Sequence, residues 1–414
     1  MNENRSSGSV SLAVIGGGYG GLCAAVMASA CKIKVTVFER QDKPLKKIAL
    51  TGNGRCNISN ENISINDYVT DDRDTLDAIL SSFNREEENR FFSILGLGLR
   101  SDESRLYPVT GKALSVMDAL KYKCNESGVS FVCDHTVTAV LKRDDHFEIR
   151  CGNETYDTRF DLCILACGGA AGVYKENSSN GFDIVKKLGH TIKPVYPALT
   201  KVICSADDQK ALKKLDGIRV RADLKLLDDK GDLMAEESGE LQMTATGLSG
   251  IPVFDLTRYM KVGSGKAYRI SVDLLPGFTG EMFDERMKLF PLRTPETFFT
   301  GLLLPAFVPF ICGRCNINIH KRMGDLSDNE VSDLINTLHD CIFDIEKTGD
   351  LASAQISTGG VPLSEVDLHM RSKKVNGLYI IGEMLDVAGR CGGFNLHFAA
   401  SGAFNAVKDM NSYA

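Results

Sequence analysis

The stretch Val10–Glu39, VSLAVIGGGYGGLCAAVMASACKIKVTVFE, determines which fold the sequence predicts. Ser11–Ile15 is a short apolar run, typical of a buried parallel strand. After a glycine-rich turn, Leu22–Cys31 supplies small and apolar residues for a helix packed on a sheet. Lys34–Phe38 is a second apolar strand, and Glu39 closes it. This order of elements predicts a βαβ unit that opens a parallel sheet.

The glycines between the first strand and the helix have the spacing G-x-G-x-x-G, at Gly16, Gly18 and Gly21. Gly16 permits a tight turn, Gly18 lets the backbone approach a pyrophosphate, and Gly21 allows the helix to pack closely on the strand. The helix N-terminus presents unpaired N–H groups and partial positive charge to phosphates. Glu39, about 20 residues further on, can accept hydrogen bonds from ribose hydroxyls. The complete unit predicts a dinucleotide site, with FAD and NAD both possible.

Composition and charge restrict the class of protein. A length of 414 residues is enough for two or three domains, and a net charge of −6 argues against a nucleic-acid-binding surface. The N-terminus is polar, unlike a secretory signal. The longest apolar run, Phe298–Ile311, is interrupted by Pro305 and Pro309 and is too short to span a membrane. We therefore expect a soluble, cytoplasmic protein without a membrane span or a nucleic-acid partner, of undetermined oligomeric state.

Cysteine is frequent in this chain, which has 13 of them. Without a secretion signal, they are expected to be reduced thiols that behave as small buried hydrophobes. Cys312-Gly-Arg-Cys315 has the spacing of a dithiol redox motif but lacks the βαβ context of one. No cluster of cysteines and histidines has metal-ligand spacing, so we expect no metal site.

Two further segments combine glycine with small polar side chains. The first is Thr51–Asn57, TGNGRCN, which can lay its backbone against a planar ring or a phosphate. The alternative for this segment is a plain surface turn. The second is the apolar strand Leu162–Cys167, which runs into Gly168 and Gly169 at the carboxyl edge of the predicted sheet, where a second cofactor contact is expected.

The late stretch Gly377–Ala406, GLYIIGEMLDVAGRCGGFNLHFAASGAFNA, repeats this pattern. A buried strand at Leu378–Ile381 is followed by two acids, and the diglycine Gly392-Gly393 opens a helix of small residues. The alternative is a simple C-terminal strand and helix. However, acids past a strand and a diglycine at a helix start suit a polyhydroxyl chain and a pyrophosphate. Two such sites, far apart in the sequence, favour one long cofactor, FAD.

The region between these two segments has a different character. From His190 onwards short strand patterns with hairpin turns predict an inserted β-barrel-like domain, and Thr279–Phe310 predicts helices broken by prolines. Asn329–Glu346 has the apolar periodicity of one amphipathic helix. The predicted fold is α/β: a Rossmann-like FAD-binding domain built from both chain ends, an inserted β-rich domain and a helical subdomain. Their predicted bounds are 1–190 with 352–414, 191–278 with 318–351, and 279–317.

Four motifs together resemble a known bacterial flavoprotein family. They are the glycine turn with Glu39, TGNGRCN, AQISTGGV at Ala354–Val361, and GLYIIGEMLDVAG-x-x-GGFNL. The family consists of NAD(P)/FAD-dependent oxidoreductases of the BaiN-like or aminoacetone oxidase-like type, and the resemblance runs from Leu12 to Ala406. It implies the same three-part architecture. The chain departs from the family pattern at Phe394, where tyrosine is usual, at His397, and near Ala245, where a histidine is expected.

The resemblance implies FAD contacts at residues from three of these motifs and at Lys47 and Gly168. These are Gly16, Gly18, Gly21, Glu39, Lys47, Thr51, Gly54, Arg55, Cys56, Asn57, Gly168, Gly382, Glu383, Asp386, Gly392, Gly393 and Asn395. We add neighbouring residues to the predicted cofactor site: Tyr19, Gly20, Arg40, Val137, Cys167, Gly169 and Phe394.

The resemblance further implies an FAD-dependent oxidoreductase that reduces an activated C=C or C=O of a hydrophobic small molecule, such as a steroid or bile-acid enone. NADH or NADPH would bind transiently as electron donor, because no second complete G-x-G-x-x-G predicts a separate nucleotide domain. Seven residues are candidates for catalysis, each with the alternative of a structural role: Arg55, Cys56, Asn57, Tyr174, Arg390, Cys391 and His397. The alternative functions are an oxidase of amines or amino ketones and a redox sensor that uses Cys312 and Cys315.

Overall fold

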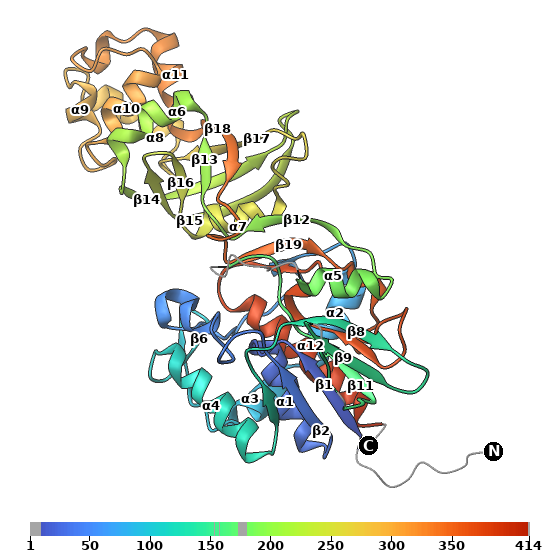
Figure 1. The fold of residues 1–414 in the computed structure, drawn as a ribbon. Helices are drawn as coiled ribbons and strands as arrows, with labels where there is room; N and C mark the ends of the chain where they lie inside the picture. The colour runs from blue at the N-terminus through green and yellow to red at the C-terminus, as the bar shows by residue number, and fades with distance from the viewer. Residues whose placement is uncertain (1–9, 153, 157, 173–179, 413–414) are drawn as a thin grey trace. The chain divides into compact units, whose positions relative to one another are not determined.

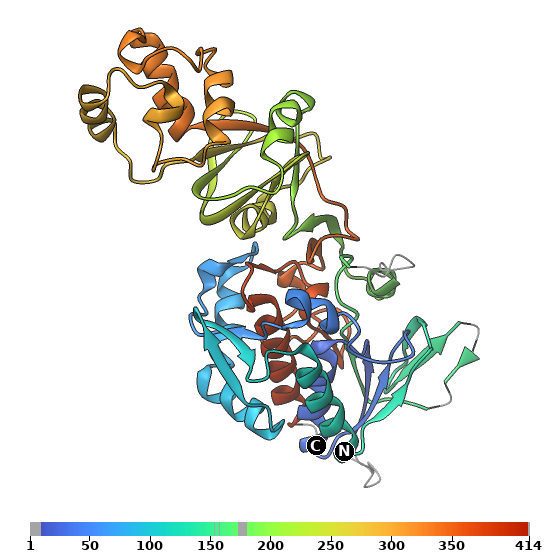
Figure 2. The same cartoon turned by 90° about the vertical axis from the view of Figure 1, so that its left-hand side faces the viewer.

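The computed structural model describes residues 10–152, 154–156, 158–172 and 180–412. The chain forms two compact units: Met1–Val195 with Ile356–Ala414, and Tyr196–Gln355. The first unit therefore contains both ends of the chain, blue and red in Figures 1 and 2. The predicted α/β fold, with a parallel sheet and a barrel, is confirmed.

A five-stranded parallel sheet forms the centre of the first unit, in the order β20-β11-β1-β2-β7. Each pair of neighbours is parallel. The strands are β1 (Ser11–Ile15), β2 (Lys34–Phe38), β7 (Ser130–Val132), β11 (Leu162–Leu165) and β20 (Leu378–Ile380). The chain leaves β1 for β2 on one side, whereas β11 and β20 lie on the other. The carboxyl ends of β1 and β11 thus form a topological switch point, the place where open α/β sheets bind ligands.

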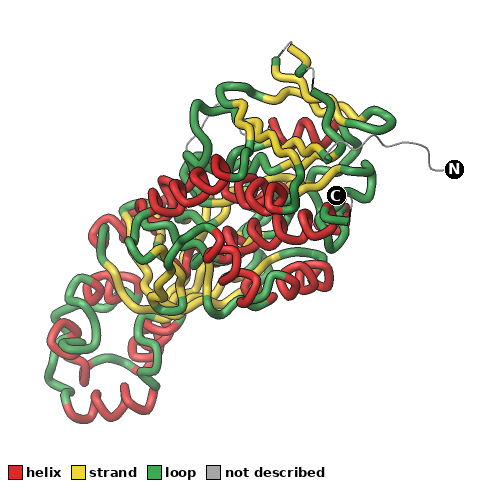
Figure 3. The backbone as a smooth tube through the Cα atoms, turned by 90° about the horizontal axis from the view of Figure 1, so that it is seen from below, coloured by secondary structure: helices red, strands yellow, loops and turns green. Residues whose placement is uncertain are grey.

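Helices α1 (Tyr19–Ala30) and α12 (Phe394–Met410) pack against each other beside this sheet. Figure 3 shows the helical layer of this unit from below, next to the strands. Small residues permit the close approach, since a Cβ added at Gly20 would lie 3.4 Å from the Cβ of Ala399. The first and last helices are therefore parts of one core. Elsewhere in the unit, Phe38 of β2 packs edge-to-face on Phe160, with ring centroids 5.8 Å apart.

The remaining elements of the first unit surround this core. The strands are β3 (Ser59–Asn60), β4 (Tyr68–Val69), β5 (Leu99–Asp102), β6 (Arg105–Pro108), β8 (Val137–Lys142), β9 (Phe147–Cys151), β10 (Glu154–Thr155), β19 (Ile356–Gly360) and β21 (Ala388–Gly389). Strand β12 (Lys193–Ala198) begins in this unit and pairs with β19. The helices are α2 (Arg73–Ser82), α3 (Arg85–Ile94), α4 (Ala113–Glu126) and α5 (Asn180–Lys187).

The second unit contains a closed antiparallel barrel of six strands in the order β13-β16-β15-β14-β17-β18. These are β13 (Val202–Cys204), β14 (Arg219–Leu227), β15 (Leu233–Thr244), β16 (Gly247–Ser249), β17 (Tyr268–Asp273) and β18 (Cys341–Thr348). The same unit holds α6 (Ala206–Leu212), α7 (Ile251–Leu256), α8 (Gly280–Leu289), α9 (Pro295–Phe298), α10 (Phe307–Arg314) and α11 (Asp328–His339). Its helices and its barrel share one hydrophobic core.

The prediction of a single helix over Asn329–Glu346 is wrong in its second half. Helix α11 begins at a capping box in which Ser327 accepts from the N–H of Glu330, and it ends at His339. The following residues form β18, whose residues Cys341–Ile345 pair with β17. Cys341, Phe343 and Ile345 are buried and alternate with more exposed residues, the period of a strand. The helical periodicity continued across this boundary only because apolar residues at 342 and 345 fit both periods.

A buried polar cluster joins the end of α5 to the segment 363–375 in the first unit. His190 lies 2.7 Å from Glu365 through Nδ1 and 2.8 Å from the Ser372 hydroxyl through Nε2. Lys374 donates to the other carboxylate oxygen of Glu365 at 2.8 Å. Burial alone would raise the pKa of Glu365, but hydrogen bonds from Lys374, Thr191 and His190 outweigh it and lower the pKa to about 2. Burial lowers the pKa of His190 below its usual value, which favours the neutral imidazole at neutral pH.

We predict that this cluster stabilises the fold at neutral pH and loses its contribution in acid. Glu365 has a lowered folded-state pKa, so its contribution is complete above an unfolded pKa of about 4.5 and disappears as the pH falls towards 2. Glu365→Gln should lower the free energy of unfolding by about 1 kcal/mol at pH 7, and by much less at pH 3, measured by urea denaturation. A difference between variant and wild type that grows in acid would contradict this assignment.

Candidate functional site

The carboxyl ends of three strands meet at one edge of the parallel sheet. The N–H of Ala166 donates to the carbonyl of Ile15 at 2.8 Å, and the N–H of Ile381 donates to the carbonyl of Leu165 at 3.1 Å. These bonds extend the pairing beyond the ends of β1, β11 and β20. They bring together the glycine turn after β1, the glycine pair after β11 and the acidic turn after β20, which lie far apart in the sequence.

The three motif glycines have different roles. Gly16 has a φ of +110°, and a Cβ there would lie 2.4 Å from the carbonyl oxygen of Ala166. A Cβ at Gly21 would lie 2.1 Å from the carbonyl oxygen of Gly16. Neither position can therefore carry a side chain in this fold. Gly18 is extended at the N-cap of α1, and a Cβ there would have nothing within 4 Å. Gly18 borders open space in front of a helix N-terminus, the surroundings that a pyrophosphate needs.

Glu39 lies at the end of β2 beside this turn, as predicted. Its Oε2 accepts from the N–H of Gly17 at 2.8 Å, and its Oε1 accepts from the N–H of Gln41 at 2.9 Å. The carboxylate is thus fixed against the glycine turn by the backbone. Each oxygen has a second lone pair, which leaves capacity to accept a ribose hydroxyl.

Glu383, in the turn after β20, connects the other two loops. Its Oε1 accepts from the N–H of Ser357 at 3.0 Å, and its Oε2 pairs with Lys47 Nζ at 2.9 Å. A Cβ at Gly169 would lie 2.3 Å from Glu383 Oε1, so the backbone of Gly169 lies directly against this carboxylate. Lys47 also donates to the carbonyl of Ala171 at 3.1 Å. The predicted residues Lys47, Gly169 and Glu383 therefore form one cluster.

Asp386, the second acid of this turn, is held by residues that sequence reasoning missed. It accepts from the N–H of Gly359 at 2.8 Å and pairs with Lys193 at 2.9 Å, and Lys193 also pairs with Asp71. Gly359 belongs to AQISTGGV, so that motif was the available signal. No signal in the sequence pointed to Lys193, because a single lysine at the start of a strand does not differ from any other surface lysine.

The diglycine lies at the N-terminus of α12, against the Thr51–Asn57 loop. Gly393 has a φ of +93°, and a Cβ there would lie 2.3 Å from the carbonyl oxygen of Ser59 and 2.6 Å from Asn57 Oδ1. Asn57 Oδ1 is buried, yet it has no hydrogen-bond partner in the described parts of the chain. A buried acceptor without a donor is costly, so this atom marks a place for a ligand N–H. The flavin ring carries such a group, and these residues fit FAD.

Comparison with known proteins agrees with this geometry. Residues 10–409 match the family model described as the HI0933-like protein Rossmann domain. The chain belongs to this family. A 3-dehydro-bile acid delta(4,6)-reductase of Clostridium scindens is 32% identical over 94% of this chain and 96% of its own length. A ribosomal RNA dihydrouridine synthase of Escherichia coli is 24% identical over 96% of this chain and 97% of its own.

The fold is also similar to that of 3-ketosteroid-delta4-(5alpha)-dehydrogenase from Rhodococcus jostii. That match has 11% identity, a TM-score of 0.49 and coverage of 98% of both chains, values too low to support a statement on function. The family assignment confirms the resemblance read from the four motifs. The protein is an FAD-dependent oxidoreductase of the HI0933-like family.

The predicted catalytic residues occupy several environments. Arg55 pairs with Asp102 at 3.1 Å, and its guanidinium lies 4.5 Å from the centre of the Tyr107 ring. Cys56 is fully buried, and burial raises the pKa of its thiol to about 11, so it is neutral at physiological pH. Arg390 lies near Asp67, with 3.7 Å between the charged groups. Cys391 is half-buried next to the diglycine, and Tyr174 lies outside the described residues.

His397 lies one helical turn after the diglycine, since its N–H donates to the carbonyl of Gly393 at 2.9 Å. Its side chain is buried against Glu88, with Nδ1 2.9 Å from the carboxylate.

The remaining predicted cofactor residues line the same loops or the core beneath them. Tyr19, Val137 and Phe394 are buried, and Thr51 donates to the carbonyl of Ile48 at 2.7 Å. The other positions are Gly20 on α1, Arg40 after β2, Gly54 in the loop, Cys167 and Gly168 after β11, Gly382 after β20, Gly392 before α12 and Asn395 on it. The side chain of Asn395 binds both the N–H and the carbonyl of Gly389, at 2.9 and 2.8 Å. This fixes the loop that leads into the diglycine.

Cys312 and Cys315 lie at the end of α10 and do not resemble a reactive dithiol. Cys312 is buried, and burial raises the pKa of its thiol to about 11. Cys315 donates to the Thr337 hydroxyl at 3.1 Å, and its pKa is also raised by burial. Since reactivity requires a thiolate, this environment disfavours redox chemistry.

No group of three or more His, Cys, Asp or Glu side chains among the described residues could hold a metal ion. No helix in the described part of the chain is long and apolar enough to cross a membrane.

We predict that Gly18→Ala weakens FAD binding at least tenfold without unfolding the protein. The added methyl group enters space that is empty in the protein and that the pyrophosphate would occupy. Flavin fluorescence during titration of the apoprotein measures the affinity. The matched control is Gly280→Ala, also with nothing within 4 Å, but in the second unit. Equal FAD affinity of Gly18→Ala and wild type would show that the cofactor does not pass this glycine.

We also predict that Cys56 and Cys312 resist alkylation in the native protein. With pKa values near 11, each thiol has a thiolate fraction far below that of a free cysteine at pH 8. Treatment with iodoacetamide followed by peptide mass spectrometry should show modification at least tenfold slower than in urea-unfolded protein. Rapid native modification of Cys312 would revive the redox-sensor hypothesis.

Proposed function

We propose that this protein is an FAD-dependent reductase that saturates a C=C bond conjugated to a carbonyl group in a hydrophobic small molecule, such as a steroid or bile-acid intermediate. The observation that carries this proposal is the similarity, over nearly the full length of both chains, to the bile acid reductase of Clostridium scindens. Glu39, the Lys47–Glu383 pair and the diglycine at α12 support the cofactor part of it.

The reaction type has broader support than the substrate. The names of the two relatives describe different molecules, a bile acid and a uridine in ribosomal RNA. Both reactions nevertheless remove a C=C bond conjugated to a carbonyl. A family in which the substrate varies and the conjugated bond recurs favours one shared chemistry, with specificity provided by other parts of each chain.

The residues near the diglycine can supply the protein's contribution. FAD, when bound, supplies hydride transfer. Asn57 and the N-terminus of α12 would hold the polar edge of the ring, and the partial positive charge of the helix stabilises negative charge there. The guanidinium group of Arg55 can polarise the substrate carbonyl.

The balance of the reaction requires one hydride, one proton and an electron donor. The hydride adds to the carbon β to the carbonyl and the proton to the α carbon, while NADH or NADPH is oxidised to NAD⁺ or NADP⁺. Cys391, half-buried beside the diglycine, is one candidate for the proton donor, whereas the Cys56 thiol is buried in the core.

A second candidate is reduction of uridine in RNA, favoured by the similarity to the Escherichia coli enzyme. A net charge of −6 opposes it, because RNA-binding surfaces are generally basic. The amine or amino-ketone oxidase remains an alternative from the sequence.

Anaerobic stopped-flow spectroscopy separates these functions. NADH or NADPH should bleach the flavin absorbance, and 4-androstene-3,17-dione should restore it with formation of the saturated ketone. The saturated 5α-androstane-3,17-dione, which lacks the conjugated bond, is the control and should leave the flavin reduced. Reoxidation by a uridine-containing RNA but not by the enone would support the second candidate. Rapid oxygen-dependent turnover of amines would contradict the reductase.

A further inference from the structure

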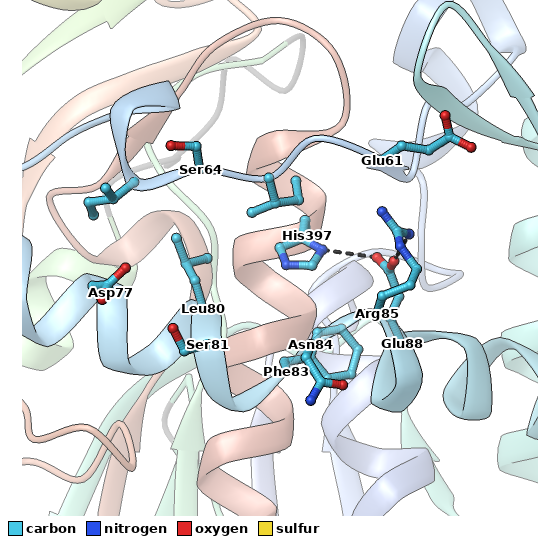
Figure 4. Close-up of a pocket in the computed structure, with 12 residues that line it drawn as sticks. Glu61, Ser64, Asp77, Leu80, Ser81, Phe83, Asn84, Arg85, Glu88 and His397 are labelled. Atoms are coloured by element: carbon cyan, nitrogen blue, oxygen red, sulfur yellow. Dashed lines mark hydrogen bonds and ion pairs between the residues drawn. The ribbon is translucent and has the colours of Figure 1, made fainter.

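A cavity of about 450 Å³ lies in the first unit, on the side of α12 that faces α2 and α3 (Figure 4). All the residues that line it come from this unit: Glu61, Ile63, Ser64, Ile65, Asp77, Leu80, Ser81, Phe83, Asn84, Arg85, Glu88 and His397. Leu80, Phe83, Glu88 and His397 are buried and form its floor, whereas the rim combines the half-buried Ile63 and Ile65 with polar side chains. The volume is within the usual range for a small-molecule site, about 300–1,000 Å³.

The floor contains an oriented histidine. His397 Nδ1 lies 2.9 Å from Glu88 Oε1 and 3.1 Å from the Ser59 hydroxyl, and the histidine side chain is only 5% exposed. Glu88 is itself buried and also pairs with Arg85. A carboxylate oxygen accepts, so in this contact the hydrogen lies on Nδ1 of the imidazole. In that tautomer the other nitrogen, Nε2, presents a lone pair. It has no partner among the described residues, and Figure 4 shows it on the side of the ring away from Glu88.

Three polar side chains around the rim already have partners. Asn84 Oδ1 caps α3 by accepting from the N–H groups of Glu86 and Glu87, at 3.0 and 3.1 Å. Ser64 accepts from the N–H of Asn66 at 3.2 Å. Arg85 donates to the carbonyl of Asn60 in addition to pairing with Glu88. His397 Nε2, by contrast, lies at the base of the cavity without a partner among the described residues.

We propose that this cavity is a second small-molecule site, separate from the cofactor site, which binds a neutral compound with a hydroxyl group and an apolar body. The hydroxyl donates to His397 Nε2, and the apolar body contacts Leu80, Phe83 and the isoleucines at 63 and 65. Glu61, Asp77 and Glu88 outnumber Arg85 around the cavity, which disfavours an anionic ligand. The proposal does not depend on the reductase function.

The test uses FAD-loaded protein and a matched pair of fluorinated probes. 4-Fluorophenol carries the hydroxyl donor, and 4-fluoroanisole has the same ring with that donor methylated. In ¹⁹F NMR titrations, the phenol resonance should broaden and shift in a saturable manner. The anisole should bind at least tenfold more weakly. Equal affinity of the two probes, or no saturable response to the phenol, would overturn the proposal.

Three variants assign the binding to this cavity. Ser81→Trp, on the exposed rim, fills the cavity from outside and should abolish the response. The control Ser93→Trp changes an exposed residue of α3 that does not line the cavity, and it should bind as wild type does. His397→Phe should reduce phenol affinity at least tenfold and remove the preference for the phenol over the anisole. Binding that persists in Ser81→Trp would place the probe elsewhere and refute the site, even if His397→Phe does not fold.

Discussion

The close approach of the β1 and β11 ends is the constraint on which the rest of the first unit depends. At Gly16 the two strands come so near that a single Cβ would overlap the carbonyl of Ala166. This contact aligns the strand ends at the switch point of the sheet. It also directs the chain from β1 into α1 so that the helix N-terminus, with its unpaired N–H groups, faces the open space at Gly18. The position of the site follows from backbone packing before any side chain is considered.

The same constraint explains why both chain ends are needed. β20 adds to the sheet beside β11, which brings Glu383 to Gly169 and Lys47, and α12 packs on α1 through small residues. The diglycine of α12 then lies against the loop that carries Asn57. A cofactor that extends from Glu39 to Asn57 and the diglycine of α12 would contact segments from the two ends of the sequence. Binding would therefore stabilise the unit as a whole, because it favours only the state in which these segments are together.

The sequence predicted the parts of this fold that depend on local pattern. The glycine spacing, the strand before it and Glu39 after it define a βαβ unit wherever they occur together, so β1, α1 and β2 were found. The boundary between α11 and β18 was not predicted, because Ile342 and Ile345 suit a helix as well as a strand. Only pairing with β17 decides between the two. Lys193 beside Asp386, and Glu88 beside His397, depend on contacts between residues distant in the sequence. A single sequence contains no signal for such pairs.

A crystal structure of the FAD-loaded protein tests the central claim most directly, namely that one cofactor spans the motifs from both chain ends. The account predicts adenosine density at Glu39, pyrophosphate density at Gly18, and the flavin ring at the diglycine, with a ring N–H bonded to Asn57 Oδ1. Flavin density away from Gly392 and Gly393, or an Asn57 Oδ1 still without a partner in the complex, would contradict it.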